Sequence, residues 1–163
     1  MTSRSLLESL LCRLVLLGIL LSAASCGEPL KSYEFVVVKS GRTTHITDDG
    51  RRTVVPFVTN PYLTLNFGAT DPYVAVGLDT TRVVLNQKHQ IPSAMFADGY
   101  ELVVHIDGTD YDSKKSGSTG YLLVSALGLQ SSPEAITLDA ELAAVLTDGT
   151  NAVSITGTIR YRK

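Results

Sequence analysis

Apolar and polar residues alternate in short runs over most of the chain, from Tyr33 to Lys163. The alternation is most regular near the C-terminus, where every second residue of 136–146 and of 153–161 is apolar or small. Residues 62–67 repeat the pattern, with Leu63, Leu65 and Phe67 on one face. A period of two places one face of a β-strand in a core and the other in solvent. The pattern therefore predicts β-strands, and it offers no long amphipathic helix.

The predicted strands are short and closely spaced. They cover residues 33–38, 43–47, 51–55, 62–67, 73–78, 82–85, 100–106, 121–127, 136–146 and 153–161. About eight to ten short strands, with turn signals every 8–12 residues, are typical of antiparallel sandwiches and barrels. We therefore expect an all-β fold, an antiparallel β-sandwich, with a small closed β-barrel as the alternative.

Turn-forming residues predict how some strands are joined. Asp48-Asp49-Gly50 indicates a hairpin between residues 43–47 and 51–55, because Asp-Gly steps favour tight turns. Residues 92–97 favour a helical turn, and residues 108–119, rich in Asp, Ser, Lys and Gly, favour a polar loop. Ser132-Pro133-Glu134 could open a helix. A period of two nevertheless holds from Ile136 to Glu141, which favours a strand there.

The N-terminal segment has a different character. Leu14–Leu21 reads LVLLGILL, Arg4 and Arg13 precede it, and small residues 22–25 lead into Cys26. This run is too short to span a bilayer as a helix, which needs about 20 residues. A basic start, a short apolar stretch and a small-residue end form the pattern of a cleaved signal peptide. Residues 1–25 are therefore predicted to be a signal peptide.

This segment resembles the signal peptide of bacterial lipoproteins, in which a small-residue site precedes a cysteine that is acylated. Ala24 and Ser25 match that pattern, whereas Ala23 stands where leucine is usual and Glu8 interrupts a basic leader. The resemblance implies that Cys26 carries a lipid and begins the mature protein. It also implies location in the bacterial cell envelope, and Gly27 in place of aspartate would favour the outer membrane, facing the periplasm or the cell surface.

Two other readings of the N-terminal segment remain open. An ordinary secretory signal cut near Ala24 would leave Cys26 as a free thiol. A retained membrane anchor is the third reading.

Removal of residues 1–25 would leave 138 residues, enough for one domain with a substantial core. We expect a short membrane-proximal tether at 26–32 and a single β-sandwich domain at 33–163. The mature chain would hold 12 basic and 15 acidic residues, with both signs scattered along it. Nucleic-acid binding is not expected, because it needs clustered basic residues. Cys12 lies in the leader, so a disulfide within the mature domain is excluded.

Catalytic motifs are not found in the sequence. G-x-S-x-G, H-E-x-x-H and C-x-x-C are missing, and neither Lys-Ser-Gly string is accompanied by Ser-x-x-Lys. The acidic segment 107–112, with Asp107, Asp110 and Asp112, could offer oxygens to calcium, but its spacing differs from an EF-hand. Asp-Gly turns also occur for backbone reasons alone. We expect a solvated loop and no resident metal or other cofactor.

Three further side chains are weak candidates for binding. His105 is predicted on the outward face of its strand, near Glu101 and Asp107, where a metal or a shifted pKa is conceivable. Tyr62 and Tyr73 fall on the polar faces of neighbouring strands and could form a platform for a ligand. A solvated sheet face and cross-strand tyrosine packing are the favoured explanations of the same residues.

The sequence therefore predicts a lipid-anchored protein of the bacterial envelope with a non-enzymatic structural or binding role. Its partners would be the membrane, through the N-terminal lipid, and an unidentified envelope protein or small ligand. The alternative is a lipocalin-like carrier, which needs an internal cavity of several hundred Å³ for its apolar ligand. An enzyme would need His105 and an acidic neighbour inside a concave pocket.

Overall fold

The structure, a computed structural model, describes residues 31–48, 54–68, 70–129 and 136–163. These residues form an antiparallel sheet of 11 strands and one short helix, which confirms the predicted all-β class. The elements are β1 (Lys31–Lys39), β2 (Arg42–Thr47), β3 (Val55–Thr59), β4 (Tyr62–Gly68), β5 (Tyr73–Asp79), β6 (Lys88–Ile91), α2 (Met95–Asp98), β7 (Tyr100–Ile106), β8 (Thr109–Asp112), β9 (Thr119–Leu129), β10 (Ile136–Thr147) and β11 (Ala152–Arg162). The first strand begins two residues before the expected start of the domain.

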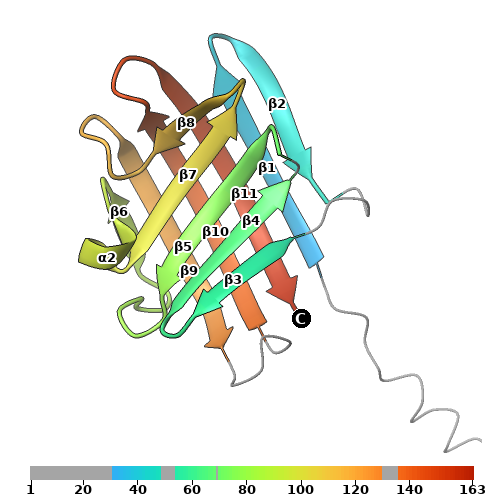
Figure 1. Cartoon of the computed structure of the whole chain (residues 1–163), viewed down its shortest axis with the longest axis vertical. Helices are drawn as coiled ribbons and strands as arrows, with labels where there is room; N and C mark the ends of the chain where they lie inside the picture. The colour runs from blue at the N-terminus through green and yellow to red at the C-terminus, as the bar shows by residue number, and fades with distance from the viewer. Residues whose placement is uncertain (1–30, 49–53, 69, 130–135) are drawn as a thin grey trace, which may run out of the picture.

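The strands form two layers that cross each other (Figure 1). One layer has the order β2-β1-β11-β10-β9-β6 and the other the order β3-β4-β5-β7-β8. A single bridge between Thr147 of β10 and Asp112 of β8 joins them into one sheet. The sheet does not close into a barrel, so the predicted sandwich-like fold is observed and the barrel alternative is not.

The core lies between the two layers and is built from the predicted inward faces. Tyr33, Phe35 and Phe67 form an aromatic cluster with ring centroids 5.1–5.8 Å apart. The alternating apolar positions of the central strands are buried: Leu63, Leu65, Phe67, Val74, Val76, Leu78, Leu102, Val104, Ile106, Ile136, Leu138, Leu142, Leu146, Val153, Ile155, Ile159 and Tyr161. The face assignments for these strands are therefore confirmed, including the strand preferred over a helix from Ile136 onward.

Two hairpins turn through consecutive residues with positive φ. Ser40 (φ 50°) and Gly41 (φ 78°) join β1 to β2, and Asp107 (φ 53°) and Gly108 (φ 69°) join β7 to β8. Two such residues in a row match a type I′ turn, whose twist suits a two-residue hairpin. The predicted loop at 108–119 is therefore partly wrong, because its first residues pair with β7 as β8. Tyr111 points into the core and drives this pairing.

The Asp-Gly hairpin predicted between residues 43–47 and 51–55 is not supported. β2 pairs with β1 in one layer, whereas β3 pairs with β4 in the other. Residues 49–53 lie outside the described residues. Strand β3 begins at Val55 and includes Pro56. Because β3 is an edge strand, proline is tolerated there although it has no N–H to donate to a neighbouring strand.

The strand predicted at 82–85 is also wrong. The backbone N–H groups of Arg82 and Val83 instead donate to the carbonyl of Asp79, which bends the chain. The strand in this region is β6, where His89 and Ile91 face inward between polar neighbours. The helical turn expected at 92–97 is present as α2.

Strand β9 contains a register shift opposite Asp139 and Ala140. Leu122 and Val124 face the core before it, and the partly buried Leu127 and Leu129 pack against the core after it. A bulge changes which residues face inward. This explains why the segment reads as uniformly apolar instead of alternating. Within the described residues, no helix has the length and hydrophobicity needed to cross a membrane.

Candidate functional site

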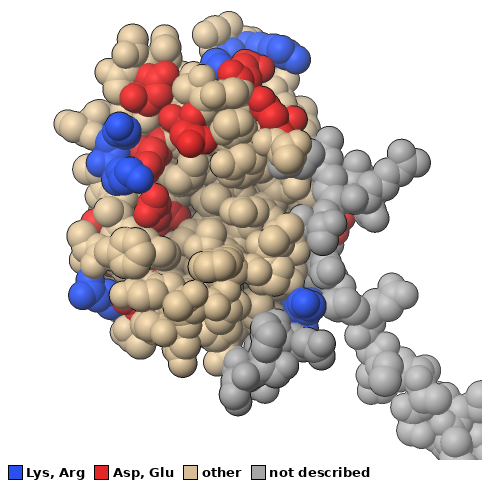
Figure 2. Space-filling view, in the orientation of Figure 1, with Lys and Arg blue, Asp and Glu red and all other residues tan. Residues whose placement is uncertain are grey.

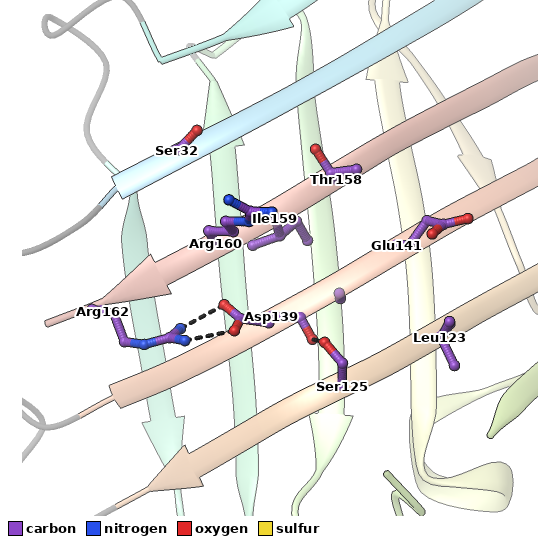
Figure 3. A pocket seen from close by; sticks show the side chains of 10 residues that line it. Ser32, Leu123, Ser125, Asp139, Glu141, Thr158, Ile159, Arg160 and Arg162 are labelled. Carbon is purple, nitrogen blue, oxygen red and sulfur yellow. Dashed lines mark hydrogen bonds and ion pairs between the residues drawn. The ribbon is translucent and has the colours of Figure 1, made fainter. Parts of the chain in front are cut away.

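The outer face of the layer containing β1, β11, β10 and β9 carries a shallow groove (Figure 3). Two adjoining hollows of about 730 and 410 Å³ share Glu141 and Thr158 in their linings. The strand register explains the groove, because Glu34, Thr158, Glu141 and Leu123 form one row across four strands. Small side chains such as Ser32, Ser125 and Ala143 leave space between the longer ones. We call this surface the sheet groove.

One end of the sheet groove is held by an ion pair between neighbouring strands. Both terminal guanidinium nitrogens of Arg162 donate to Asp139, with Nη1 2.6 Å from Oδ1 and Nη2 2.5 Å from Oδ2. These hydrogen bonds lower the pKa of the Asp139 carboxyl and raise the pKa of Arg162. A planar two-point pair fixes both side chains more strongly than a single contact. It therefore defines the charge and shape of that end.

We expect the Asp139–Arg162 pair to make the free energy of unfolding depend on pH. The pKa of Asp139 is lower in the folded state than in the unfolded chain, where it is about 4. The ionised carboxylate therefore contributes its full stabilisation above the unfolded pKa, and this stabilisation is lost as the pH falls through the folded pKa. Asp139→Asn should lower the free energy of unfolding by about 0.5–1 kcal/mol at neutral pH. The loss is small because both side chains of the pair are partly exposed to solvent. Urea unfolding at neutral and acidic pH measures this.

Arg162→Gln is the matched variant. The double variant, with both substitutions, should lose no more stability than either single variant, because all three lack the same ion pair. A loss for Asp139→Asn that stays constant down to the acid limit would contradict this role for the pair.

Tyr121 and Glu141 border the middle of the sheet groove. The Tyr121 hydroxyl lies 2.8 Å from Glu141 Oε1, and this hydrogen bond raises the pKa of Tyr121. Lys88 Nζ lies 4.0 Å from the centroid of the Tyr121 ring, in cation–π contact. Hydroxyl, carboxylate and guanidinium groups thus surround the groove. Neither histidine nor cysteine is among its described lining residues.

His105 faces outward as predicted, but its neighbours differ from those expected. Its Nδ1 lies 2.6 Å from Asp110 Oδ1, its Nε2 lies 3.9 Å from Asp71 Oδ2, and its ring stacks on Tyr73 at 4.8 Å. Glu101 instead meets Lys114 at 3.5 Å. Asp71 is the residue that the sequence reasoning missed, because it comes from the turn between β4 and β5. The imidazole of His105 therefore links β7 to β8 and to the turn between β4 and β5.

The three aspartates considered for calcium point to different partners. Asp107 pairs with Lys39 at 3.0 Å, Asp110 with His105, and the buried Asp112 with Lys114 at 2.7 Å. Asp112 also accepts from the backbone N–H of Lys114 at 2.9 Å. Among the described residues, no three His, Cys, Asp or Glu side chains are grouped to hold a metal ion. Instead of a loop, the segment is a hairpin braced by ion pairs.

Tyr62 and Tyr73 do not form a shared platform. They lie at opposite ends of the paired strands, since Tyr62 faces Asp79 and Tyr73 faces Gly68 across the β4–β5 ladder. Tyr62 packs edge-on against Phe96 of α2, with ring centroids 5.1 Å apart. Phe96 gave no sequence signal, because its helix is only four residues long.

Comparison of the chain with protein-family models, with curated proteins and with solved structures finds no match.

Proposed function

We propose that the chain is a lipid-anchored protein of the bacterial cell envelope with a non-enzymatic binding role. The sequence Ala23-Ala24-Ser25-Cys26 after a short apolar run carries the proposal. The architecture is compatible with it, because β1 begins at Lys31, only five residues after Cys26. A lipid on Cys26 would therefore hold the domain directly beside the bilayer.

The sheet groove is the proposed binding surface. Its described lining offers Ser, Thr, Glu, Asp and Arg side chains, a chemistry suited to a polar ligand. The lipocalin-like alternative needs a closed barrel around an apolar cavity, and the sheet is not closed. Three side-chain pairs elsewhere, at Lys39, His105 and Lys114, are braces between strands and turns. Because these side chains already hold one another in place, they favour a binding role for the domain over a catalytic one.

The anchor is tested by mass spectrometry of the N-terminus and by membrane fractionation. In the native host, the mature protein should begin at Cys26 with an acyl modification and should need detergent for extraction. Cys26→Ser should abolish the acyl mass, because serine lacks the thiol that receives the lipid. The leader cysteine provides the control: Cys12→Ser should leave the mature protein and its lipid unchanged. A wild-type protein that is soluble and carries no lipid would refute the proposal.

A further inference from the structure

Two phenylalanines on the outer side of the β3–β8 layer are exposed to an unusual degree. Phe96 is 70% exposed and Phe57 is 68% exposed, the highest values among the large apolar residues described. Tyr62 contacts Phe96 edge-on at 5.1 Å. Phe57 pairs with Thr64, so it lies diagonal to Tyr62 on the same face of the sheet. We call Phe57, Tyr62 and Phe96 the aromatic patch.

The exposure of Phe96 is built into the local structure. Helix α2 has no buried residue, yet both of its ends are fixed. Arg82 Nη1 donates to the carbonyls of Phe96 at 3.2 Å and of Ala97 at 2.8 Å, and Asp98 accepts from the N–H of Ala94 at 2.8 Å. These bonds hold the aromatic ring outward. An apolar surface that hydrogen bonds of the fold keep exposed to solvent commonly marks an interaction site.

More apolar side chains follow at the same end of the domain. Val84 (54% exposed) and Leu85 (44% exposed) lie in the segment between β5 and β6. This segment starts beside the β3–β4 turn, since the N–H of Thr80 donates to the carbonyl of Pro61 at 3.0 Å. The exposed apolar area therefore extends beyond the aromatic patch itself.

The aromatic patch lies at the end of the domain that holds the start of β1 and the end of β11. In Figure 1, the start of β1, the C-terminus, the β3–β4 turn and α2 all lie in the lower half. Lys31 pairs with Tyr161 there. The five residues from Cys26 to Lys31 reach at most about 18 Å when extended. A lipid on Cys26 would thus bring this end, and not the opposite one, to the bilayer.

The two ends of the domain also differ in the charged side chains that they carry. Charged side chains of both signs gather in the upper half of the face in Figure 2, whereas the middle of the lower half carries few, with basic groups at its sides. Asp71 and Asp107 lie in turns at the upper end and Asp110 lies beside them in β8, with Lys39 paired to Asp107. The exposed side chain of Arg82 and the terminal Lys163 belong to the lower end. Bacterial envelope lipids are commonly anionic, and they attract basic groups while repelling acidic ones.

We infer that the aromatic patch docks onto the lipid surface in which Cys26 is anchored. Aromatic and aliphatic side chains of such a patch enter the interfacial layer to a depth of about 5–10 Å. The patch then fixes the orientation of the domain, so that the end carrying Asp71 and Asp107 points away from the membrane. This inference rests on the proposed anchor at Cys26 for its geometry.

The test uses the absence of tryptophan from the chain. A single tryptophan is introduced by Phe96→Trp or Phe57→Trp, both at exposed positions where folding is preserved. Val145→Trp is the control, because Val145 is 39% exposed near the far end of β10, on the other layer. The lipidated proteins are placed in phosphatidylethanolamine–phosphatidylglycerol vesicles with and without brominated acyl chains, which quench tryptophan on contact. Tryptophan at 96 and 57 should lose roughly half of its fluorescence or more, and tryptophan at 145 should be unaffected.

The outcomes separate this inference from the proposed anchor. Vesicle-bound, lipidated protein with no quenching at positions 96 and 57 overturns the docking, and the anchor stands. Equal quenching at 145 also overturns it, because the domain then has no fixed orientation. If the protein carries no lipid, the proposed anchor fails, and the same vesicles are mixed with the unlipidated variants. Quenching at 96 then supports docking by the patch alone, whereas its absence, as expected for a patch that binds protein, refutes it.

Discussion

Ile155→Ala is expected to destabilise the domain by about 2–5 kcal/mol, a large share of the total stability of about 5–15 kcal/mol. Ile155 is 1% exposed on β11, the strand between β1 and β10. It faces Val37 on one side and Ala144 on the other, so truncation opens a cavity that two neighbouring strands border. Urea unfolding followed by circular dichroism measures the loss.

The next residue provides the matched control. Thr156 lies on the outer face of β11, within the sheet groove. Thr156→Ala should cost no more than about 1 kcal/mol, the scale of cross-strand pair effects. A larger loss for Thr156→Ala than for Ile155→Ala would show that the faces of β11 are reversed, because a shift of one residue exchanges them.

Gly120→Ala should be comparably damaging for a backbone reason. Gly120 has φ 128°, a conformation that L residues rarely adopt. An added Cβ would lie 2.3 Å from the carbonyl oxygen of Ala143 and 2.5 Å from Cα of Ala144, both backbone atoms of the paired strand β10. Strain and collision together should lower the free energy of unfolding by about 2–6 kcal/mol. Thermal or urea unfolding detects this readily.

Gly149→Ala separates the two effects. Gly149 also has a positive φ, 105°, but no atom lies within 4 Å of an added Cβ. Its substitution should therefore cost only the strain, about 1–3 kcal/mol. Equal losses at the two glycines would mean that β9 and β10 approach less closely at Gly120 than described.

The sheet groove and the aromatic patch could not be read from the sequence. The row containing Glu34, Glu141 and Thr158 exists only because β1 becomes a neighbour of β11 through a long return of the chain. Asp71 reaches His105 for the same reason, from a turn more than thirty residues earlier in the chain. Surface sites of this kind depend on strand pairing between distant segments.

The sequence by itself determined which side of each central strand is buried. Alternation is a local property, because successive side chains of a strand point to opposite faces and burial selects the apolar set. That reasoning placed Leu63, Leu65 and Phe67, and the long C-terminal hairpin, correctly. The apolar run before Cys26 is likewise local, and its interpretation as a lipid-attachment signal stays a prediction.

Only the tertiary structure decided which strands pair and where the chain changes layer. The Asp48-Asp49-Gly50 turn signal suggested a local hairpin, yet β2 pairs with β1 and β3 pairs with β4. Likewise, the polar segment after Asp107 became a strand because Tyr111 could be buried beneath it. The physical reason is that pairing is set by how much apolar surface the two layers cover together. That sum depends on the whole sandwich and not on any one segment.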